Sequence, residues 1–399
     1  MNRIFADLHI HLGRTESNLP VKITAARNMT FHHVVQEASG NKGLSMIGII
    51  DAHSPPVQEE IQAGITQGIY QEHPNGGIIY QNTVCLLGVE VECREPNTGP
   101  FHMLAYFPTL EAIKQFTAWL QLHMKNVQLS TQRLYQPVLA FMKKVKSLQG
   151  LVVPAHIFTP FKSLYGSATT SIRNLLDISL LDAVELGLSA DTYMADQISE
   201  LATLPFLTNS DAHSLPKIGR EYNEFLVEEP SFQEFTHVLK QKRDRKIVAN
   251  YGLNPRLGKY YQTFCLVCEL QKEKAKQTCP ACGSIKEVTG VKDRIAMIKD
   301  QPSTSPNNRP SYIHQIPLDF IPKVGNKTIS KLISHFGSEM NILHHAPIEE
   351  IAKVTNETLA NYIDRARKNN LIVEKGGGGT YGKVISSPVT RRLSCQEYH

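Results

Sequence analysis

Long hydrophobic runs are missing from this sequence. No apolar stretch approaches the roughly 20 residues that a helix needs to cross a bilayer, and no basic and apolar leader follows Met1. We therefore expect no membrane association and a cytoplasmic location. With 41% hydrophobic and 20% charged residues among 399, the chain has the composition of a soluble globular protein of two or three domains.

Cysteine is scarce outside one short segment. Two Cys-x-x-Cys pairs stand ten residues apart and use four of the seven cysteines: Cys265, Cys268, Cys279 and Cys282. In a cytosolic chain such clustering favours a metal site over disulfides, because four thiolates in paired turns suit tetrahedral Zn²⁺. Two redox pairs are the alternative. We predict a structural zinc module over residues 251–300, folded by the ion because so short a stretch cannot build its own core.

Negative charge is scarce in the last third of the chain. Residues 1–250 carry 21 Lys and Arg against 24 Asp and Glu, whereas residues 251–399 carry 21 against 13. A polyanion is therefore expected to bind the last third, although a modest positive excess also serves solubility alone.

The first 250 residues alternate short apolar strands with helical stretches. Strands are predicted over 4–10, 44–50, 84–89, 102–107, 151–153, 182–186, 205–208 and 247–249, and helices over 31–38, 110–124, 134–148 and 232–242. This alternation is typical of parallel βα units and predicts an α/β barrel. In such a barrel the active site lies at the carboxyl ends of the strands.

Residues that ligate metals follow several of these strands. In Asp7-Leu8-His9-Ile10-His11 the strand period places both imidazoles on one face with Asp7 beside them. Later strands deliver further candidates, namely Asp51, His53, Glu90, His102, His156, Asp211 and His213. Any one of these histidines is more simply a buried core residue, and a histidine-rich surface strand explains the first motif alone. The whole series favours a metal centre.

The chemistry that this series indicates is metal-assisted hydrolysis. Imidazole and carboxylate together suit Zn, Mn, Mg or Fe, and so many ligands fit two or three ions. Glu90 is placed to bridge two of them. We predict Glu90, Asp211 and Asp7 as catalytic residues.

These motifs resemble those of the polymerase and histidinol phosphatase (PHP) phosphoesterases, over about residues 1–250. The resemblance implies a distorted seven-stranded βα barrel. It implies that His9, His11, Glu90 and Asp211 bind one ion, that Glu90, His102 and His156 bind a second, and that His213 lies towards a third. The usual Thr-Asp-His appears as Ile-Asp-Ala-His at 50–53, so either Asp51 or His53 is expected to coordinate. Amidohydrolases also begin with His-x-His, but they usually end on a lone Asp and supply a bridging lysine.

A helical DNA-binding domain is predicted over 311–385. Ile-Pro-Lys-Val-Gly-Asn-Lys-Thr at 321–328, followed by a helix over 329–336, resembles the hairpin of a helix-hairpin-helix motif, whose backbone amides bind a DNA phosphate. Lys323 stands where glycine is common, and a weaker second copy is expected over 349–363. An ordinary pair of helices is the alternative. The DNA-binding candidates are Lys323, Gly325, Lys327, Lys331, Gly378 and Tyr381.

The Gly-rich stretch at 376–382 has two interpretations, a loop that lets the backbone approach a sugar-phosphate chain or a flexible linker. Residues 386–399 are expected to form a disordered tail.

The order of barrel, four-cysteine module and basic helical C-terminus resembles the endonuclease Q family over the whole chain apart from the tail. The resemblance implies a DNA repair endonuclease that cleaves 5′ of deaminated bases (uracil, hypoxanthine, xanthine) and abasic sites, leaving 3′-hydroxyl and 5′-phosphate ends. It implies damaged DNA as the partner, with the altered base turned out of the stack. A sliding clamp is kept as a further partner class, although the sequence shows no clear clamp motif.

Two other functions compete with this one. A small-molecule phosphoesterase leaves the basic last third without a purpose. A non-catalytic DNA-binding protein is disfavoured by the nearly complete ligand set.

Overall fold

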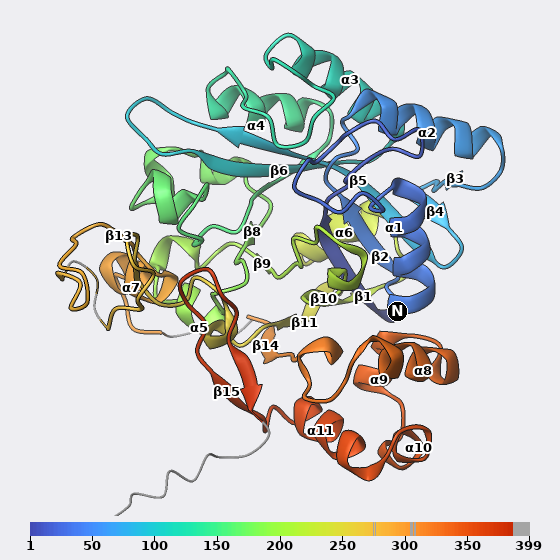
Figure 1. Ribbon diagram of the computed structural model, residues 1–399. Helices are drawn as coiled ribbons and strands as arrows, with labels where there is room; N and C mark the ends of the chain where they lie inside the picture. Colours follow the sequence, from blue (N-terminus) through green and yellow to red (C-terminus); the bar gives the residue numbers. More distant parts are fainter. Residues whose placement is uncertain (274, 276, 304–305, 307–308, 386–399) are drawn as a thin grey trace, which may run out of the picture.

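The computed structural model describes residues 1–385 except 274, 276, 304–305 and 307–308, so the expected tail at 386–399 lies outside the described residues. Figure 1 shows a strand-built body wrapped by helices, with a small module at one side and a group of C-terminal helices below. Among the described residues, every helix is too short or too polar to span a bilayer.

A barrel of seven strands forms the body of the described chain. Their order is β1 (Asn2–Ile10), β2 (Met46–Ile49), β5 (Thr83–Cys93), β6 (Phe101–Phe107), β7 (Leu151–Pro154), β8 (Val184–Glu185) and β9 (Phe206–Leu207). The Asp182 N–H donates to Val152 O and so links β8 to β7, and the circuit closes where Ala212 bridges to Ile10 of β1. The predicted distorted barrel is confirmed.

The strands are not all parallel, which corrects the expectation of uniform βα units. β1, β2 and β5 run parallel, as do β8 and β9, but β6 is antiparallel to both β5 and β7. The reason is the connection between β5 and β6, which spans only 94–100, whereas a parallel crossover needs about a dozen residues or more.

The sheet extends beyond the barrel from the first half of β1, on the side opposite β2. β10 (Tyr222–Val227) pairs antiparallel with β1, and β11 (Lys246–Gly252) and β14 (Ser311–His314) follow it. The sequence did not predict β10. A hairpin of β3 (Gln71–Glu72) and β4 (Ile78–Tyr80) adds to β5 at the other edge. Because β14 pairs with β11, the segment that leads into the C-terminal helices is part of this sheet.

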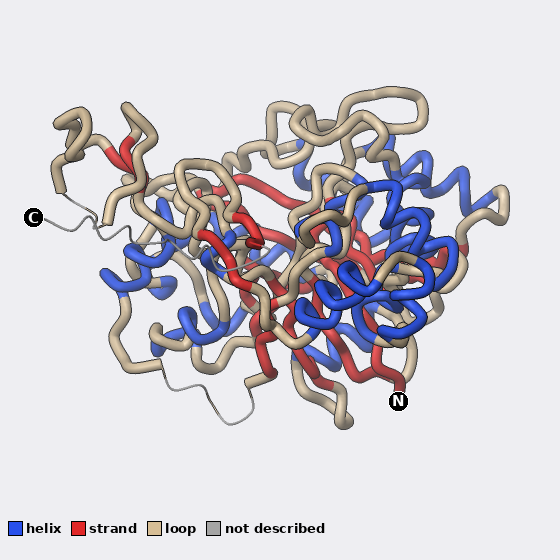
Figure 2. Tube along the Cα trace, turned by 60° about the horizontal axis from the view of Figure 1, so that its bottom comes forward, coloured by secondary structure: helices blue, strands red, loops and turns tan. Residues whose placement is uncertain are grey.

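Two apolar layers pack on the strands. Leu8, Leu86 and Tyr106 belong to one layer with Phe235 of α6 (Phe232–Leu239). The other layer lies beneath helices that surround the strands in Figure 2. These helices are α1 (Phe31–Glu37), α2 (Pro55–Thr66), α3 (Leu110–Gln121) and α4 (Val138–Ser147). Thr30 caps α1 through the His33 N–H. The sequence did not predict α2, and α4 starts later than expected because Pro137 precedes it.

The C-terminal third forms a small module and a helical group. The module holds β12 (Phe264–Cys265) and β13 (Glu287–Val288), after which α7 (Val291–Ile298) returns to pack against α5 (Thr192–Ala195). The helical group comprises α8 (Asn326–Phe336), α9 (Glu339–His344), α10 (Ile348–Val354) and α11 (Glu357–Arg367), and it ends in the hairpin β15 (Ile372–Glu374) and β16 (Lys383–Ile385).

Two contacts fix the helical group against the barrel. Lys42 Nζ lies 2.7 Å from Glu339 Oε1, and Tyr222 Oη lies 2.7 Å from His344 Nε2. Both Lys42 and Tyr222 are buried, so these polar contacts form inside an interface.

Candidate metal centre

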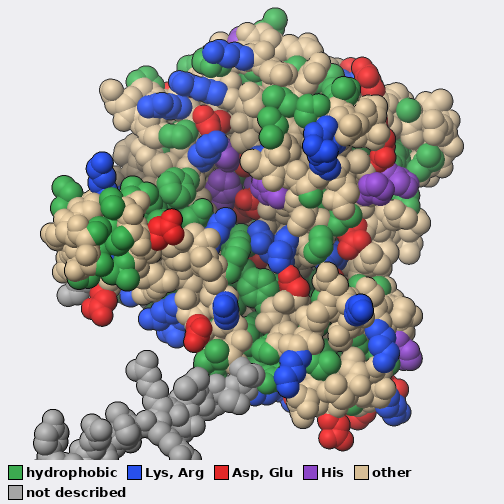
Figure 3. All heavy atoms as spheres, in the orientation of Figure 1, with side chains coloured by type: hydrophobic (Ala, Val, Ile, Leu, Met, Phe, Trp, Pro, Cys, Tyr) green, Lys and Arg blue, Asp and Glu red, His purple; other side chains and the backbone are tan. Residues whose placement is uncertain are grey.

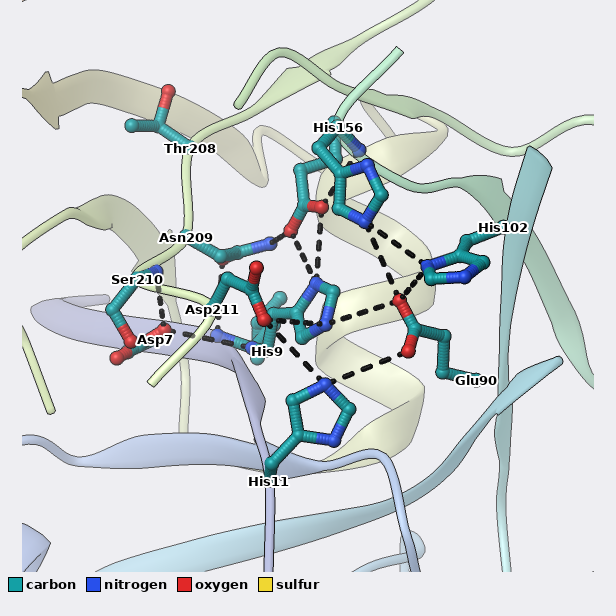
Figure 4. A network of polar contacts seen from close by, with 12 residues as sticks. Asp7, His9, His11, Glu90, His102, His156, Thr208, Asn209, Ser210 and Asp211 are labelled. Atoms are coloured by element: carbon teal, nitrogen blue, oxygen red, sulfur yellow. Dashed lines mark hydrogen bonds and ion pairs between the residues drawn. The ribbon is translucent and has the colours of Figure 1, made fainter. Parts of the chain in front are cut away.

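One rim of the barrel collects the predicted ligands. His9 lies near the carboxyl end of β1 and Glu90 near that of β5, while His156 follows β7 and Asp211 follows β9. His102 opens β6, yet it reaches the same rim because β6 is antiparallel and pairs it with Glu92. Figure 4 shows these side chains pointing toward one another from separate strands.

The described residues contain three His and carboxylate groups that could each hold a metal ion. They are His9, His11 and Glu90; Glu90, His102 and His156; and His11, Asp211 and His213, with the ligand atoms of each group within 4.8 Å of one another. The structure therefore brings together seven of the nine predicted metal ligands.

Two carboxylates link the groups. Glu90 Oε1 lies 2.8 Å from His102 Nδ1 and 3.4 Å from His156 Nε2, while its Oε2 lies 3.5 Å from His11 Nε2. Asp211 Oδ1 lies 3.4 Å from the Nε2 atoms of both His9 and His11. Glu90 is therefore placed to bridge two ions, as its position in the sequence predicts.

The donor atoms fit divalent cations. The Nδ1 of His9 lies 3.0 Å from Glu185 Oε1, and the Nδ1 of His11 lies 3.0 Å from Asp51 Oδ2. With Nδ1–H donating outward, both Nε2 lone pairs face the Glu90 and Asp211 carboxylates. Buried acceptor atoms that face one another need a cation between them. The buried Nε2 of His9 has no hydrogen-bond partner among the described residues.

The central carboxylates are ionised at neutral pH. Burial by itself raises the pKa of both. For Glu90, His102 and Lys22 overcome burial and hold the pKa well below its usual value. For Asp211, the neighbouring imidazoles of His9 and His11 do so. The centre therefore offers the negative charge that divalent ions require.

Three predicted residues do not join the ligand groups. Asp7 accepts from the backbone N–H groups of Ser210 (3.1 Å) and Gly219 (2.8 Å), and so fastens the loop after β9 to β1. Asp51 contacts His11 at Nδ1, the ring nitrogen that points away from the ligand cluster. His53 is fully buried and lies in none of the three groups. Asp7 and Asp51 thus make contacts that position the loop after β9 and His11, and the catalytic role of Asp7 and coordination by Asp51 or His53 stay predictions.

The sequence places Glu185 on the predicted strand over 182–186, but neither Glu185 nor Lys22 is among the predicted site residues. Glu185 holds His9 and also accepts from Asn209 Nδ2 (2.8 Å) and the His156 N–H (2.9 Å). The position of Glu185 at the end of an apolar strand, like that of the other ligand candidates, is a local signal that could have identified it as a site residue. The Lys22 Nζ lies 3.3 Å from Glu90 Oε2, and no local motif marks it.

Two of the clustered residues have an unusual backbone. His156 has a φ of 29° and Asp211 a φ of 47°, in the left-handed region that favours glycine. Strained backbone persists where the surrounding structure imposes it, often at functional sites. The strain indicates that the rim fixes these two ligands firmly.

The predicted four-cysteine cluster is present. Cys265 Sγ lies 3.5 Å from Cys282 Sγ, and Cys268 Sγ lies 3.5 Å from Cys279 Sγ, too long for disulfides and close to the ~3.8 Å between thiolates around tetrahedral Zn²⁺. Backbone N–H groups of Cys268 and Val267 lower the pKa of Cys265 to about 6, which favours the thiolate.

A cavity of about 470 Å³ opens above the metal centre. Its lining includes His102, His156, Asp211 and His213, together with three aromatic and four cationic residues: Phe161, Tyr260, Tyr381, Lys162, Lys217, Arg220 and Lys259. Figure 3 shows histidines in a hollow at the centre of the molecule, with Lys and Arg side chains around it. A larger cavity of about 780 Å³ is lined by Arg3, at the opposite end of β1, and by none of the residues of the three ligand groups.

Tyr381 connects this cavity to the C-terminal hairpin. Arg220 donates to Ser210 O (2.9 Å) beside Asp211 and to Tyr381 Oη (3.1 Å). The Gly-rich stretch is a packed loop in which the Gly376 N–H donates to Arg256 O (2.7 Å), which excludes the flexible-linker interpretation. Gly378 has a φ of 61°, a conformation that glycine adopts without strain.

The helix-hairpin-helix candidates lie on the turn before α8 and on the first half of this helix. Gly325 caps α8, and Lys323, Lys327 and Lys331 are exposed. Lys323 has a φ of 69°, in the left-handed region that favours glycine, at the position where glycine is common. At the expected second copy, residues 349–363, the structure has α10 and α11 joined at Thr355 and Asn356, an arrangement that the alternative of an ordinary helix pair shares.

Family models match two parts of the chain. Residues 192–243 match the model described as PHP-associated, and residues 324–370 match the MJ0043 C-terminal domain. The chain is 50% identical over 386 residues to the uncharacterized protein YqxK of Bacillus subtilis, covering 96% of this chain and all of that one. It is 39% identical over 254 residues to the uncharacterized protein MJ0043 of Methanocaldococcus jannaschii, of which it covers 31%.

Solved structures match nearly the whole chain. The lesion-specific endonuclease PfuEndoQ from Pyrococcus furiosus superposes with a TM-score of 0.83 at 32% identity, covering 96% of this chain and 95% of that one. Endonuclease Q in complex with a 27-mer duplex carrying an abasic lesion at its active site gives the same TM-score and identity. The barrel and its rim thus define a metal-dependent phosphoesterase of the PHP type. The chain belongs to the endonuclease Q family, and the predicted enzyme class, an endonuclease, is confirmed at the level of the family.

Proposed function

We propose that this protein is a DNA repair endonuclease that hydrolyses the phosphodiester 5′ of deaminated bases and abasic sites. The observation that carries the proposal is a phosphoesterase-type centre opening directly into a cavity lined by aromatic and cationic side chains. Support comes from the relative that holds an abasic duplex at its active site. Both features suit a nucleotide whose phosphate lies on metal ions while its base or sugar is turned aside.

The ligand groups set the chemistry. Bound divalent ions supply a hydroxide at neutral pH and neutralise the charge that builds on the phosphoryl group. Glu90 reaches His11, His102 and His156, and Asp211 reaches His9 and His11, so these two carboxylates would hold bound ions close together. Glu185 and Asp51 hold His9 and His11 in the orientation that turns Nε2 toward the ligand cluster. Attack of the water oxygen on phosphorus breaks the P–O3′ bond, and the leaving 3′ oxygen takes a proton.

The cavity supports recognition of an extruded nucleotide. Phe161 is half exposed and packs edge-on against Tyr260 at 5.6 Å between ring centroids. The Lys259 Nζ lies 5.0 Å from the Tyr260 ring and 5.9 Å from the Tyr381 ring. Aromatic faces stack on bases, and the flanking cations attract the backbone, so this wall suits an unpaired nucleotide more than a small ester.

The C-terminal helices extend the binding surface. We assign the N-terminus of α8, with Gly325 and the exposed Lys323, Lys327 and Lys331, to contacts with a DNA phosphate. Zinc is assigned to the four-cysteine module on its donor set and spacing.

The experiment compares four substrates at equal concentration with Mn²⁺ or Mg²⁺. They are a duplex with one uracil, a duplex with one abasic site, the undamaged duplex and bis(p-nitrophenyl) phosphate. The proposal predicts one nick on the 5′ side of each lesion, with 3′-hydroxyl and 5′-phosphate ends, and little cleavage of the undamaged duplex. Equal cleavage of damaged and undamaged duplex, or turnover of the small ester alone, contradicts it.

A further inference from the structure

Lys22 reaches into the metal centre from outside the ligand set. Its ammonium group donates to His11 Nε2 and to Glu90 Oε2, both at 3.3 Å, and to Thr131 Oγ1. The side chain is largely buried, with 15% of its surface exposed. A cation is therefore held against two of the three residues of the first ligand group.

The backbone around Lys22 fixes this approach. The Lys22 N–H donates to Leu12 O (3.0 Å), just beyond β1, and the Ser130 N–H donates to Val21 O (2.9 Å), which ties in the loop carrying Thr131. Thr131 Oγ1 in turn donates to Glu90 Oε2. The position of the lysine is thus built by two segments far apart in the sequence.

The segment then runs along the edge of the cavity. Thr24 lines the cavity together with Asp211 and His213, and the Ala26 N–H donates to His213 O (2.8 Å). Lys22 contacts the ligand cluster, and the same segment reaches the wall of the cavity two residues later, at Thr24.

A metal ion and this ammonium group cannot use His11 at the same time. The Nε2 lone pair that accepts from Lys22 is the one that the ion needs, and like charges at such a separation repel strongly in a buried site. The four rotatable bonds of the lysine side chain allow its end to turn away without movement of the backbone.

We propose that Lys22 is a further catalytic residue of this centre, displaced from His11 and Glu90 by the first metal ion and then bound to a non-bridging oxygen of the scissile phosphate. This inference rests on the proposed function for its substrate. A displaced ammonium group beside the cavity lacks an anionic partner until the phosphate arrives, and it then stabilises the charge that grows during attack. Thr131 remains to hold Glu90.

The first arm of the test measures Mn²⁺ binding without DNA, by loss of the free-ion signal in electron paramagnetic resonance. The variants are Lys22→Met, Lys22→Arg and, as a matched control, Lys240→Met at an exposed lysine after α6. Removal of the competing cation is expected to tighten Mn²⁺ binding about five- to tenfold in Lys22→Met. The control should bind as the wild type does. Unchanged or weaker binding by Lys22→Met overturns the displacement.

The second arm measures single-turnover nicking of an abasic duplex at saturating Mn²⁺. Loss of a donor to the transition state predicts a fall of about a hundredfold for Lys22→Met, with most of the rate kept by Lys22→Arg. A wild-type rate for Lys22→Met overturns the phosphate contact. If the wild type itself nicks no DNA, the proposed function fails separately, and bis(p-nitrophenyl) phosphate takes the place of DNA in the same comparison.

Discussion

Glu185 lies 3.0 Å from Nδ1 of His9, although 176 residues separate the two in the sequence. The contact joins the end of β8 to β1 across the barrel rim and selects the His9 tautomer that faces the ligand cluster. We expect Glu185→Gln to weaken divalent metal binding by about ten- to a hundredfold, the usual cost of removing a carboxylate behind a ligating histidine. A Mn²⁺ titration checks this, with Glu111→Gln on the exposed surface of α3 as the control. Equal affinities for both variants contradict the role of Glu185.

The four-cysteine module is expected to depend on its ion. Cys265→Ser with Cys268→Ser should release one equivalent of Zn²⁺ and make residues 264–288 sensitive to proteolysis, because the free energy of zinc binding is the folding free energy of so small a unit. Elemental analysis and limited proteolysis measure both effects. Cys85→Ser, at a buried thiol outside the cluster, should keep full zinc content. Retention of zinc and of resistance by the double variant rules the assignment out.

The exposed lysines of the helical group are expected to act on affinity alone. Changing Lys323, Lys327 and Lys331 to Gln should weaken binding to lesion and plain duplex equally, and lower the slope of log affinity against log salt by about 2 to 3, since each phosphate contact contributes about 0.9. A salt series measures the slope. The control changes three exposed lysines on the barrel, Lys143, Lys240 and Lys242. A slope equal to that of the wild type would show that α8 does not hold DNA.

Glu221 should make stability depend on pH. Burial raises the pKa of its carboxyl from 4.5 to about 8, despite the hydrogen bond from the Leu253 N–H. Between these values the folded protein holds a proton that the unfolded chain has lost, so this group stabilises the protein below the unfolded pKa and loses that effect as pH rises through the folded one. Urea unfolding of Glu221→Gln and wild type across this window should show the variant gaining relative stability as pH rises. A constant difference contradicts the shift.

Short-range patterns account for the parts of this molecule that the sequence predicted. His9 and His11 alternate on β1, and the paired Cys-x-x-Cys spacing by itself marks a metal module. Thr30 and the following apolar residues predict α1, which the structure confirms. Each of these signals lies within a few residues.

What sequence reasoning missed depends on contacts between distant segments. β10 pairs with β1 from more than 200 residues away in the sequence. No residue pattern within β10 itself identifies β1 as its partner. Lys22 joins the centre only because the segment after β1 folds back on Leu12 and meets the loop at Ser130. The direction of β6 placed His102 at the rim, and strand direction follows from pairing partners that no local pattern shows.

Cleavage by the metal centre itself is tested most directly at Asp211, whose Oδ1 lies 3.4 Å from both His9 Nε2 and His11 Nε2. Asp211→Asn keeps the size of the side chain but removes the charge that links two ligand groups. The measurement is single-turnover nicking of a duplex with one abasic site, with strand ends mapped and DNA affinity determined on the same samples. We expect one nick 5′ of the lesion by the wild type, a rate lower by at least about a hundredfold in Asp211→Asn, and unchanged affinity for the duplex. Nicking by Asp211→Asn at the wild-type rate would contradict cleavage by the metal centre.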